Sequence, residues 1–362
     1  MKEGGLTEAG CRTRQSRVRE QLRLHNLDAA LLADDRHVYY LTGYWTAPAF
    51  RRAVLIERDG PVTLLIEQST ECTCVADDVV KFAGGHQASL VDDQLAAAVM
   101  ALGTRLKPAM RLGCDQGVPA GLANVRCTAD FFPAMLAVRR RKEPDEIALM
   151  KRVIAATEAG YERLRQMLRP GVDTVTLYAN ILAAVAEHAG EFIGELGNDF
   201  QIGSGSGAPS RRPAERGEIA VIDLAASMRG YRSDLCRSVV VGGEPTDAQR
   251  KAHTRILEVL ESFEQTARAG VSCAELHRQA RQMLDGYNGW QFKHHLGHGV
   301  GMAPHEAPRL NDAWDDTFQV GDVVSVEPGL YGDDLRAGMR VEDMYYITEN
   351  GLERLSSHSR AL

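Results

Sequence analysis

Four carboxylates and one histidine in the C-terminal half of the chain have the residue types and the spacing of a metal centre. They are Asp223, Asp234, His298, Glu327 and Glu342. The two aspartates flank Ser227-Met-Arg-Gly230, a turn-like segment in which Gly230 is free to take positive φ. We predict a hairpin in which Asp223 and Asp234 face each other with Cβ atoms about 5 Å apart.

The two glutamates repeat this arrangement. Glu327 ends one apolar run, and Glu342 lies in a second one over 339–347. The chain between them is expected to turn near Asp334. Two hairpins would thus present two facing acid pairs, and His298 would supply a nitrogen.

Carboxylates that converge in one pocket repel one another unless cations neutralise them. Two divalent ions balance four carboxylates in formal charge, so the pattern predicts a dinuclear site. Its mostly oxygen ligands favour Mn²⁺, Co²⁺ or Zn²⁺ over copper or an iron–sulfur cluster. Such a pair of ions shares a water, lowers its pKa to give a hydroxide nucleophile, and stabilises the oxygens of a tetrahedral intermediate. The chemistry indicated is hydrolysis.

A histidine-rich segment supplies the nitrogen ligand and a candidate proton donor. His298 lies between two glycines, which let the backbone approach a ligand closely. His305 comes seven residues later, and the next residue, Glu306, is a candidate partner to fix its tautomer. As a protonated donor His305 could stabilise an oxyanion or protonate a leaving nitrogen. The alternative interpretation is that His305 has a structural role, as a capping or core histidine.

Two other features are weaker indications of function. Gly203-Ser-Gly-Ser-Gly207 resembles a phosphate loop but lacks the following Lys and Ser/Thr, so we interpret it as a flexible loop at the rim of the site. Cys236 could suggest a nucleophile, but the local sequence implies no oriented histidine partner. We interpret Cys236 as a strand residue beside a metal ligand.

Length and composition limit the class of protein. A chain of 362 residues is longer than most single cores, so two domains are expected. Its net charge of −7 gives no support for binding to nucleic acid or to an anionic membrane. The amino terminus lacks the apolar stretch of a secretory signal, and no segment is long enough to span a bilayer. Seven scattered cysteines are most simply the reduced thiols of a cytoplasmic protein.

Helices and strands alternate in the first part of the chain, which predicts an α/β domain over residues 1–140. The expected elements are a helix over 12–25, a strand over 27–32, a turn-forming stretch over 39–44, strands over 53–57 and 62–66 around the turn 58–61, a helix over 90–105, and strands near 111–114 and 134–139.

Helices dominate the start of the second domain, which we place at 141–362. A basic segment precedes Pro144, which suits the first turn of a helix. A further helix is expected over 174–189, and two later ones open with capping boxes at Thr246 and Ser272. This domain is expected to pack helices over an antiparallel sheet whose hairpins carry the ligands.

With these motifs the chain resembles the creatinase, prolidase and aminopeptidase P family, which has the pita-bread fold. The resemblance covers essentially the whole chain, with matches at Leu27–Leu32 and Val38–Gly43 as well as at every metal motif. It implies an α/β two-domain protein, in which an N-terminal creatinase-like α/β domain is followed by a C-terminal α+β pita-bread catalytic domain.

The resemblance also implies roles for individual residues. The metal ligands of the family match Asp223, Asp234, His298, Glu327 and Glu342. Its catalytic histidine beside the metals matches His305 in His305-Glu-Ala-Pro308, and a further histidine and an arginine match His294 and Arg340. The implied enzyme is a homodimeric, usually Mn²⁺- or Co²⁺-dependent, hydrolase of Xaa-Pro bonds, either a dipeptidase or an aminopeptidase.

One departure from the family concerns the substrate. Family peptidases carry a histidine in the loop before the first aspartate, whereas this chain has no histidine between residues 188 and 253. Arg211 or Arg212 could bind a substrate carboxylate there, or could simply belong to a solvated loop. Together with Tyr231 they are the predicted substrate-binding residues.

Three interpretations remain open. A metallopeptidase of the Xaa-Pro type is the leading one. A small-molecule C–N hydrolase or lyase on the same metal scaffold is favoured by the missing loop histidine. A non-catalytic binding module is disfavoured, because pita-bread domains that serve only for binding typically lose their metal ligands, and all five are present here.

Overall fold

The computed structural model divides the chain into two compact units. One comprises residues 1–139 with 143–145, and the other comprises 140–142 with 146–362. The described residues are 4–45, 50–87, 89–117, 122, 126–197, 199–203, 207–336 and 338–362. The predicted boundary lies between residues 140 and 141, in the segment 140–145 where short stretches of chain alternate between the two units.

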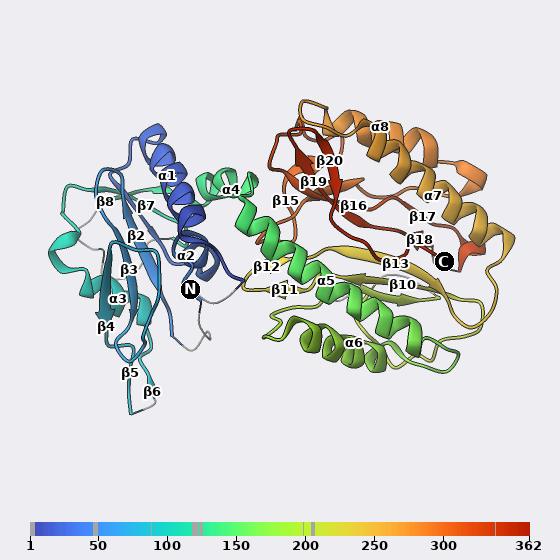
Figure 1. The fold of residues 1–362 in the computed structure, drawn as a ribbon, viewed down its shortest axis with the longest axis horizontal. Coiled ribbons are helices and arrows are strands. Elements are labelled where there is room, and N and C mark those ends of the chain that lie inside the picture. Colours follow the sequence, from blue (N-terminus) through green and yellow to red (C-terminus); the bar gives the residue numbers. More distant parts are fainter. Residues whose placement is uncertain are drawn as a thin grey trace. The chain divides into compact units, whose positions relative to one another are not determined.

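The first unit is built on a six-stranded mixed sheet in the order β4-β3-β2-β1-β7-β8 (Figure 1). Its strands are β1 Ala29–Leu32, β2 Ala53–Glu57, β3 Val62–Glu67, β4 Asp78–Phe82, β7 Arg111–Cys114 and β8 Arg126–Asp130, and a small ribbon pairs β5 Gly85–His86 with β6 Ser89–Leu90. β1, β2 and β3 pair antiparallel, whereas β4, β7 and β8 join the sheet in parallel. β1 is central and apolar, and it is buried along its whole length.

Four helices accompany this sheet. They are α1 Glu8–Leu24, α2 Asp35–Thr42, α3 Gln94–Ala101 and α4 Phe132–Arg140. α1 contacts α2 and β2, and α3 packs on β3 and β4. The helices expected over 12–25 and 90–105 and the strands expected over 27–32 and 62–66 are present with shifted ends, and the strands expected over 53–57 and 111–114 are present as predicted.

Two predictions for this unit are wrong. The stretch 39–44 is not a turn but the end of α2, which Asp34 caps by accepting a hydrogen bond from the backbone N–H of Arg36. The stretch 134–139 is not a strand but part of α4, which is preceded by β8. Pro133 suits the first turn of α4. Both segments are short apolar runs, for which the sequence period alone cannot separate helix from strand.

The helices of the second unit agree with the sequence predictions. They are α5 Pro144–Met167, α6 Thr174–Ala189, α7 Asp247–Thr266 and α8 Cys273–Leu284. The Thr246 side chain and its partner Gln249 form the reciprocal capping box, and Ser272 caps α8 by accepting from the N–H of Glu275. No helix in the described ranges combines the length and the apolar character needed to cross a membrane.

Two antiparallel sheets form the centre of the second unit. One has the order β13-β10-β9, and the other has the order β15-β14-β16-β19-β20. The strands are β9 Asp199–Ile202, β10 Ile219–Leu224, β13 Leu235–Val240, β14 Gly297–Gly299, β15 Glu306–Leu310, β16 Val323–Val326, β19 Asp343–Thr348 and β20 Gly351–Arg354. An isolated bridge between Cys236 and Glu342 joins the two sheets.

One hydrophobic core connects both sheets to α7 and α8, which lie side by side in Figure 1. Leu260 and Leu276 of these helices belong to it, as do Val221, Val324 and Tyr345 of the sheets. Because all five side chains are essentially inaccessible to solvent, this core holds the strands that carry the acidic residues in a defined register.

Candidate metal centre

The first hairpin carries Asp223 and Asp234. It consists of β10 and β13, continued by the ribbon of β11 Ser227–Met228 and β12 Tyr231–Arg232. Arg229 and Gly230 form the turn at φ of 52° and 85°. The register places Asp223 opposite Cys236, so the prediction that Asp223 and Asp234 face each other directly is wrong. The turn lies one residue later along the chain than the predicted centre, and this shifts every pair across the hairpin by two.

The second hairpin carries Glu327 and Glu342 in the predicted arrangement. β16 pairs with β19, and the ribbon of β17 Gly329–Leu330 and β18 Met339–Arg340 continues the same register. In this register Glu327 and Glu342 lie opposite each other, between the two paired segments. The chain reverses through a short 3-10 turn at Asp333–Leu335, where the turn near Asp334 is predicted.

Two groups of donor atoms gather around Glu342. One group consists of Asp234, His298 and Glu342, and the other consists of Asp223, Cys236 and Glu342, each with one donor atom per residue within 4.8 Å of the others. Glu327 lies beside the first group, with its Oε1 atom 3.5 Å from Nε2 of His298. Glu342 is the residue that the two groups share.

Backbone geometry determines which nitrogen of His298 faces the acids. Its Nδ1 lies 3.1 Å from the carbonyl oxygen of Gly299, and a carbonyl can only accept, so Nδ1 carries the proton. Nε2 therefore faces the acids, with Oδ2 of Asp234 3.7 Å away. The flanking glycines serve strand packing, since a Cβ on Gly297 or Gly299 would lie about 2 Å from a backbone oxygen of the neighbouring strand.

The pKa values of three acids at this site are strongly raised. Burial, reinforced by the charge of Asp223, raises the pKa of Asp234 to about 8. Burial also raises the pKa of Asp223 to about 6 against the opposing charge of Arg340, and it raises the pKa of Glu342 well above its usual range. Among the described residues, the Oε2 atom of Glu342 is a buried oxygen without a hydrogen-bond partner. Buried acids with raised pKa values beside an unpartnered oxygen fit a site that cations complete.

Glu327 and His298 form the charged pair of this site. Burial alone would raise the pKa of Glu327, but hydrogen bonds from His295 and His298 hold it well below its usual range. Burial opposes the charge on His298, and contact with Glu327 together with the charge of Asp234 nevertheless raises its pKa to about 9.

Arg340 and His294 support the site in different ways. Nη2 of Arg340 donates to Asp223 at 2.6 Å and to Asp199 at 3.0 Å. Nδ1 of His294 donates to a backbone carbonyl at 2.8 Å, so its Nε2 accepts from the hydroxyl of Tyr331, also at 2.8 Å. The hydroxyl of Tyr331 in turn lies 3.5 Å from Arg340. Arg340 therefore orients Asp223 and offsets its charge.

His305 lies on the loop before β15, with its ring stacked on that of His298. The ring centroids are 3.8 Å apart and the planes differ by 20°. Burial and the charges of His298 and His295 lower the pKa of His305 to about 4. The role of His305 as a proton or hydrogen-bond donor stays a prediction. Glu306, the candidate partner, accepts from two backbone N–H groups and lies 3.4 Å from Lys142.

Three residues at this site were not identified from the sequence. Asp199 lies beside Asp223 on the neighbouring strand β9. Tyr331 joins His294 to Arg340, and Nε2 of His295 lies 2.8 Å from Oε1 of Glu327. The sequence signal for His295 was its place three residues before His298, whereas Asp199 and Tyr331 reach the site only through strand pairing.

The predicted substrate-binding residues have other partners. Arg211 and Arg212 form ion pairs with acidic residues that precede α6 and β10. Tyr231 is buried, and its hydroxyl donates to Glu146 at 2.8 Å. A role of these three residues in substrate binding stays a prediction.

Two further sequence interpretations concern the rim of the site and Cys236. The middle of the predicted flexible loop 203–207, residues 204–206, lies outside the described residues. Cys236 is a strand residue of β13 opposite Asp223, as interpreted from the sequence. Burial raises the pKa of its thiol well above the usual range, which argues against a thiolate nucleophile in the metal-free molecule.

Metal binding to the metal-free protein is expected to release protons. The raised pKa values of Asp223 and Asp234, about 6 and about 8, mean that protons must leave before a cation can bind, so affinity should rise with pH across this range. Titration calorimetry in buffers of different ionisation enthalpy counts the protons released. Heats that do not depend on the buffer, together with an affinity that does not depend on pH, would contradict the assignment.

Two family models match the chain. The model for metallopeptidase family M24 matches residues 148–349, and the model for the creatinase/prolidase N-terminal domain matches residues 14–129. The first match covers more than half of the chain and includes all five predicted ligands.

Individual relatives agree with these models. An Xaa-Pro dipeptidase of Pyrococcus horikoshii is 26% identical over 351 residues, which cover 93% of this chain and 95% of that protein. An Xaa-Pro dipeptidase of Pyrococcus furiosus is 40% identical over 157 residues, which cover 43% of this chain and 44% of that protein. The solved structure of a prolidase from Pyrococcus horikoshii matches with a TM-score of 0.78 at 24% identity, over 97% of this chain and 99% of that one.

These matches confirm the predicted fold class and the resemblance that led to it. A creatinase-like α/β domain is followed by a catalytic domain with the pita-bread fold. Family M24 enzymes use divalent metals, in agreement with the donor groups around Glu342. The chain is therefore a metallopeptidase that belongs to family M24 and carries a creatinase/prolidase N-terminal domain.

Proposed function

We propose that this protein hydrolyses Xaa-Pro peptide bonds, as a dipeptidase or an aminopeptidase, with two divalent metal ions bound at the acidic site. The observation that carries the proposal is the pair of donor groups that share the carboxylate of Glu342. The activity named for the Pyrococcus horikoshii relative, which aligns over 93% of this chain, supports the choice of substrate.

The proposed metal ligands are Asp223, Asp234, His298, Glu327 and Glu342. Mn²⁺ is the first candidate because carboxylate oxygens predominate, and Co²⁺ and Zn²⁺ are the alternatives. Two such ions held there would supply Lewis acidity, which would make hydroxide available from water near neutral pH and offset negative charge that develops on the substrate.

The protein's own groups have separate roles in this proposal. Arg340 donates to one oxygen of Asp223 at 2.6 Å, and the other oxygen of this carboxylate would bind a cation. His294 supports Arg340 through the hydroxyl of Tyr331. His305 lies on the exposed face of the ring stack, and a neutral imidazole keeps one N–H that can donate to a developing oxyanion.

Substrate contacts and cellular context complete the proposal. The side chain of Arg211 is 74% exposed although it pairs with Asp173, and we assign it to a substrate carboxylate. Arg212 and Tyr231 are assigned to the same substrate on their sequence position alone. We further propose a cytoplasmic homodimer that acts on small peptides.

A second candidate is a small-molecule C–N hydrolase or lyase that uses the same metals. It is favoured by the lack of any histidine between residues 188 and 253, where family peptidases contact their substrate. The metal ligands do not separate the two candidates, because both need them.

A substrate panel separates the candidates. The metal-free protein is loaded in turn with Mn²⁺, Co²⁺ and Zn²⁺ and assayed on Xaa-Pro dipeptides, Xaa-Pro tripeptides and related small amides. We expect hydrolysis of at least one class of proline peptide with at least one metal. Turnover confined to small amides would establish the second candidate, and a protein that binds metal but cleaves no proline peptide would defeat the first.

A further inference from the structure

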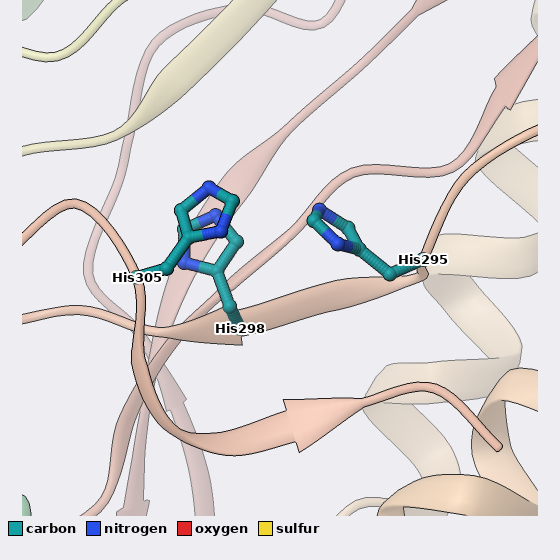
Figure 2. A group of neighbouring side chains, drawn as sticks. All are labelled: His295, His298 and His305. Atoms are coloured by element: carbon teal, nitrogen blue, oxygen red, sulfur yellow. The ribbon is translucent and has the colours of Figure 1, made fainter. Parts of the chain in front are cut away.

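His295 is a half-buried histidine at the edge of the metal centre that the five proposed ligands leave unused. Figure 2 shows its ring pointing towards the stacked rings of His298 and His305. The three rings come from different places in the chain: the segment before β14, β14 itself and the loop before β15. One nitrogen of each ring lies within 4.8 Å of the other two.

Distances around Glu327 match those between ligands of a single ion. Oε1 of Glu327 lies 2.8 Å from Nε2 of His295 and 3.5 Å from Nε2 of His298. Nε2 of His298 lies 3.7 Å from Oδ2 of Asp234. Donor atoms bound to one ion at about 2.0–2.2 Å lie roughly 2.8–3.6 Å apart in octahedral or tetrahedral geometry. Nε2 of His295 and Oε1 of Glu327 are therefore as close as two ligands of one cation would be.

The hydrogen bond of His295 shows which atom would bind. Nε2 is the ring nitrogen that faces Oε1 of Glu327, at 2.8 Å. In the neutral tautomer that metals bind, Nδ1 would carry the ring proton and Nε2 would bind the cation.

We propose that His295 is an additional metal ligand, which adds a second imidazole nitrogen to the cation position of Asp234, His298, Glu327 and Glu342. This inference rests on the proposed metal-dependent function. Imidazole suits Zn²⁺ and Co²⁺, whereas carboxylate oxygens suit Mn²⁺. The cation position beside the histidines is therefore expected to prefer Zn²⁺ or Co²⁺, although the ligand set predicted from the sequence favours Mn²⁺.

Metal competition on His295→Asn tests the proposal, with His188→Asn as the matched control because His188 is exposed near the end of α6. Both variants and the wild type are stripped of metal and titrated with Zn²⁺ and Mn²⁺, and bound metal is measured by mass spectrometry. For His295→Asn we expect the preference for Zn²⁺ over Mn²⁺ to fall by about tenfold or more. The control should match the wild type.

A second measurement on the Co²⁺-loaded wild type does not depend on how the variant folds. Each histidine bound to Co²⁺ gives a solvent-exchangeable N–H proton resonance far outside the diamagnetic range. Such resonances from both His295 and His298 would support the proposal, and loss of one in His295→Asn would assign it. A signal from His298 alone, or an unchanged Zn²⁺ preference in the variant, would overturn the inference and leave the proposed function standing. A wild type that binds no metal would defeat both.

Discussion

Glu342→Gln is expected to lose metal from both positions while it stabilises the metal-free protein. Glu342 belongs to both donor groups, so its substitution weakens each of them. Loss of a residue that merely supports a ligand costs about 10–100-fold in affinity, so loss of a bridging ligand should cost at least roughly 100-fold. Metal content measured by mass spectrometry and turnover of a proline peptide should fall together.

The gain in stability follows from the sign of the pKa shift. Because the folded protein raises the pKa of Glu342, this carboxyl ionises more easily in the unfolded chain. The free energy of unfolding of the metal-free protein therefore falls as pH rises above the unfolded value, near 4.5. An amide removes this penalty, and its Oε1 can still accept the hydrogen bond that Ser325 now donates to Glu342 at 2.7 Å. We expect about 1–3 kcal/mol of added stability near pH 8.

The control for this substitution is Glu349→Gln, at an exposed residue in the turn after β19. It should leave metal content, turnover and thermal unfolding unchanged. Thermal melts of the metal-free proteins at pH 5 and pH 8 provide the comparison. A Glu342→Gln protein that keeps two ions, or that melts lower than the wild type at pH 8 without metal, would remove Glu342 from the assigned position.

His305→Gln is expected to keep its metal and lose its activity. The ring of His305 stacks face to face on that of the proposed ligand His298 and has an exposed side, so it can reach a substrate without holding the ions. A group that exchanges a proton or a hydrogen bond with the reacting atoms contributes about 10²–10⁴-fold. We therefore expect kcat to fall by about that factor at unchanged metal stoichiometry.

His188→Gln serves as the control, since it makes the same change at an exposed position near the end of α6. Steady-state kinetics on one proline dipeptide and metal analysis of the same samples are sufficient. Unchanged kcat in His305→Gln would exclude this residue from the reaction. Loss of an ion would instead show that His305 is a ligand.

The helices of the catalytic unit were predictable because their boundaries depend on local chemistry. Thr246 and Ser272 cap α7 and α8 by accepting from backbone N–H groups three residues later. Pro144 begins α5, and Gly190 ends α6 in a left-handed conformation at φ of 66°. Each of these signals acts within one turn of helix, so the sequence contains all of it.

α2 and α4 were not predictable in this way. The six residues from His37 to Thr42 are all buried, and so are Met135 and Val138 of α4. Short buried segments of this kind show no regular alternation of apolar and polar residues. Their conformation is therefore decided by the elements that pack around them. The local tendency of a few aromatic and small residues is too weak to oppose that packing.

By itself the sequence identified five side chains that lie together at the site and predicted the hairpins that carry the four acids among them. Acids placed around turns, and a histidine between glycines, are properties of residue order. Only the tertiary structure decided the pairing: one turn position set Asp223 opposite Cys236, and pairing between strands brought Asp199 and Tyr331 to Arg340. The physical reason is distance. Residue order defines neighbours along one strand, whereas the metal centre depends on contacts of a few ångströms between strands far apart in the chain, which exist only once the core has fixed their register.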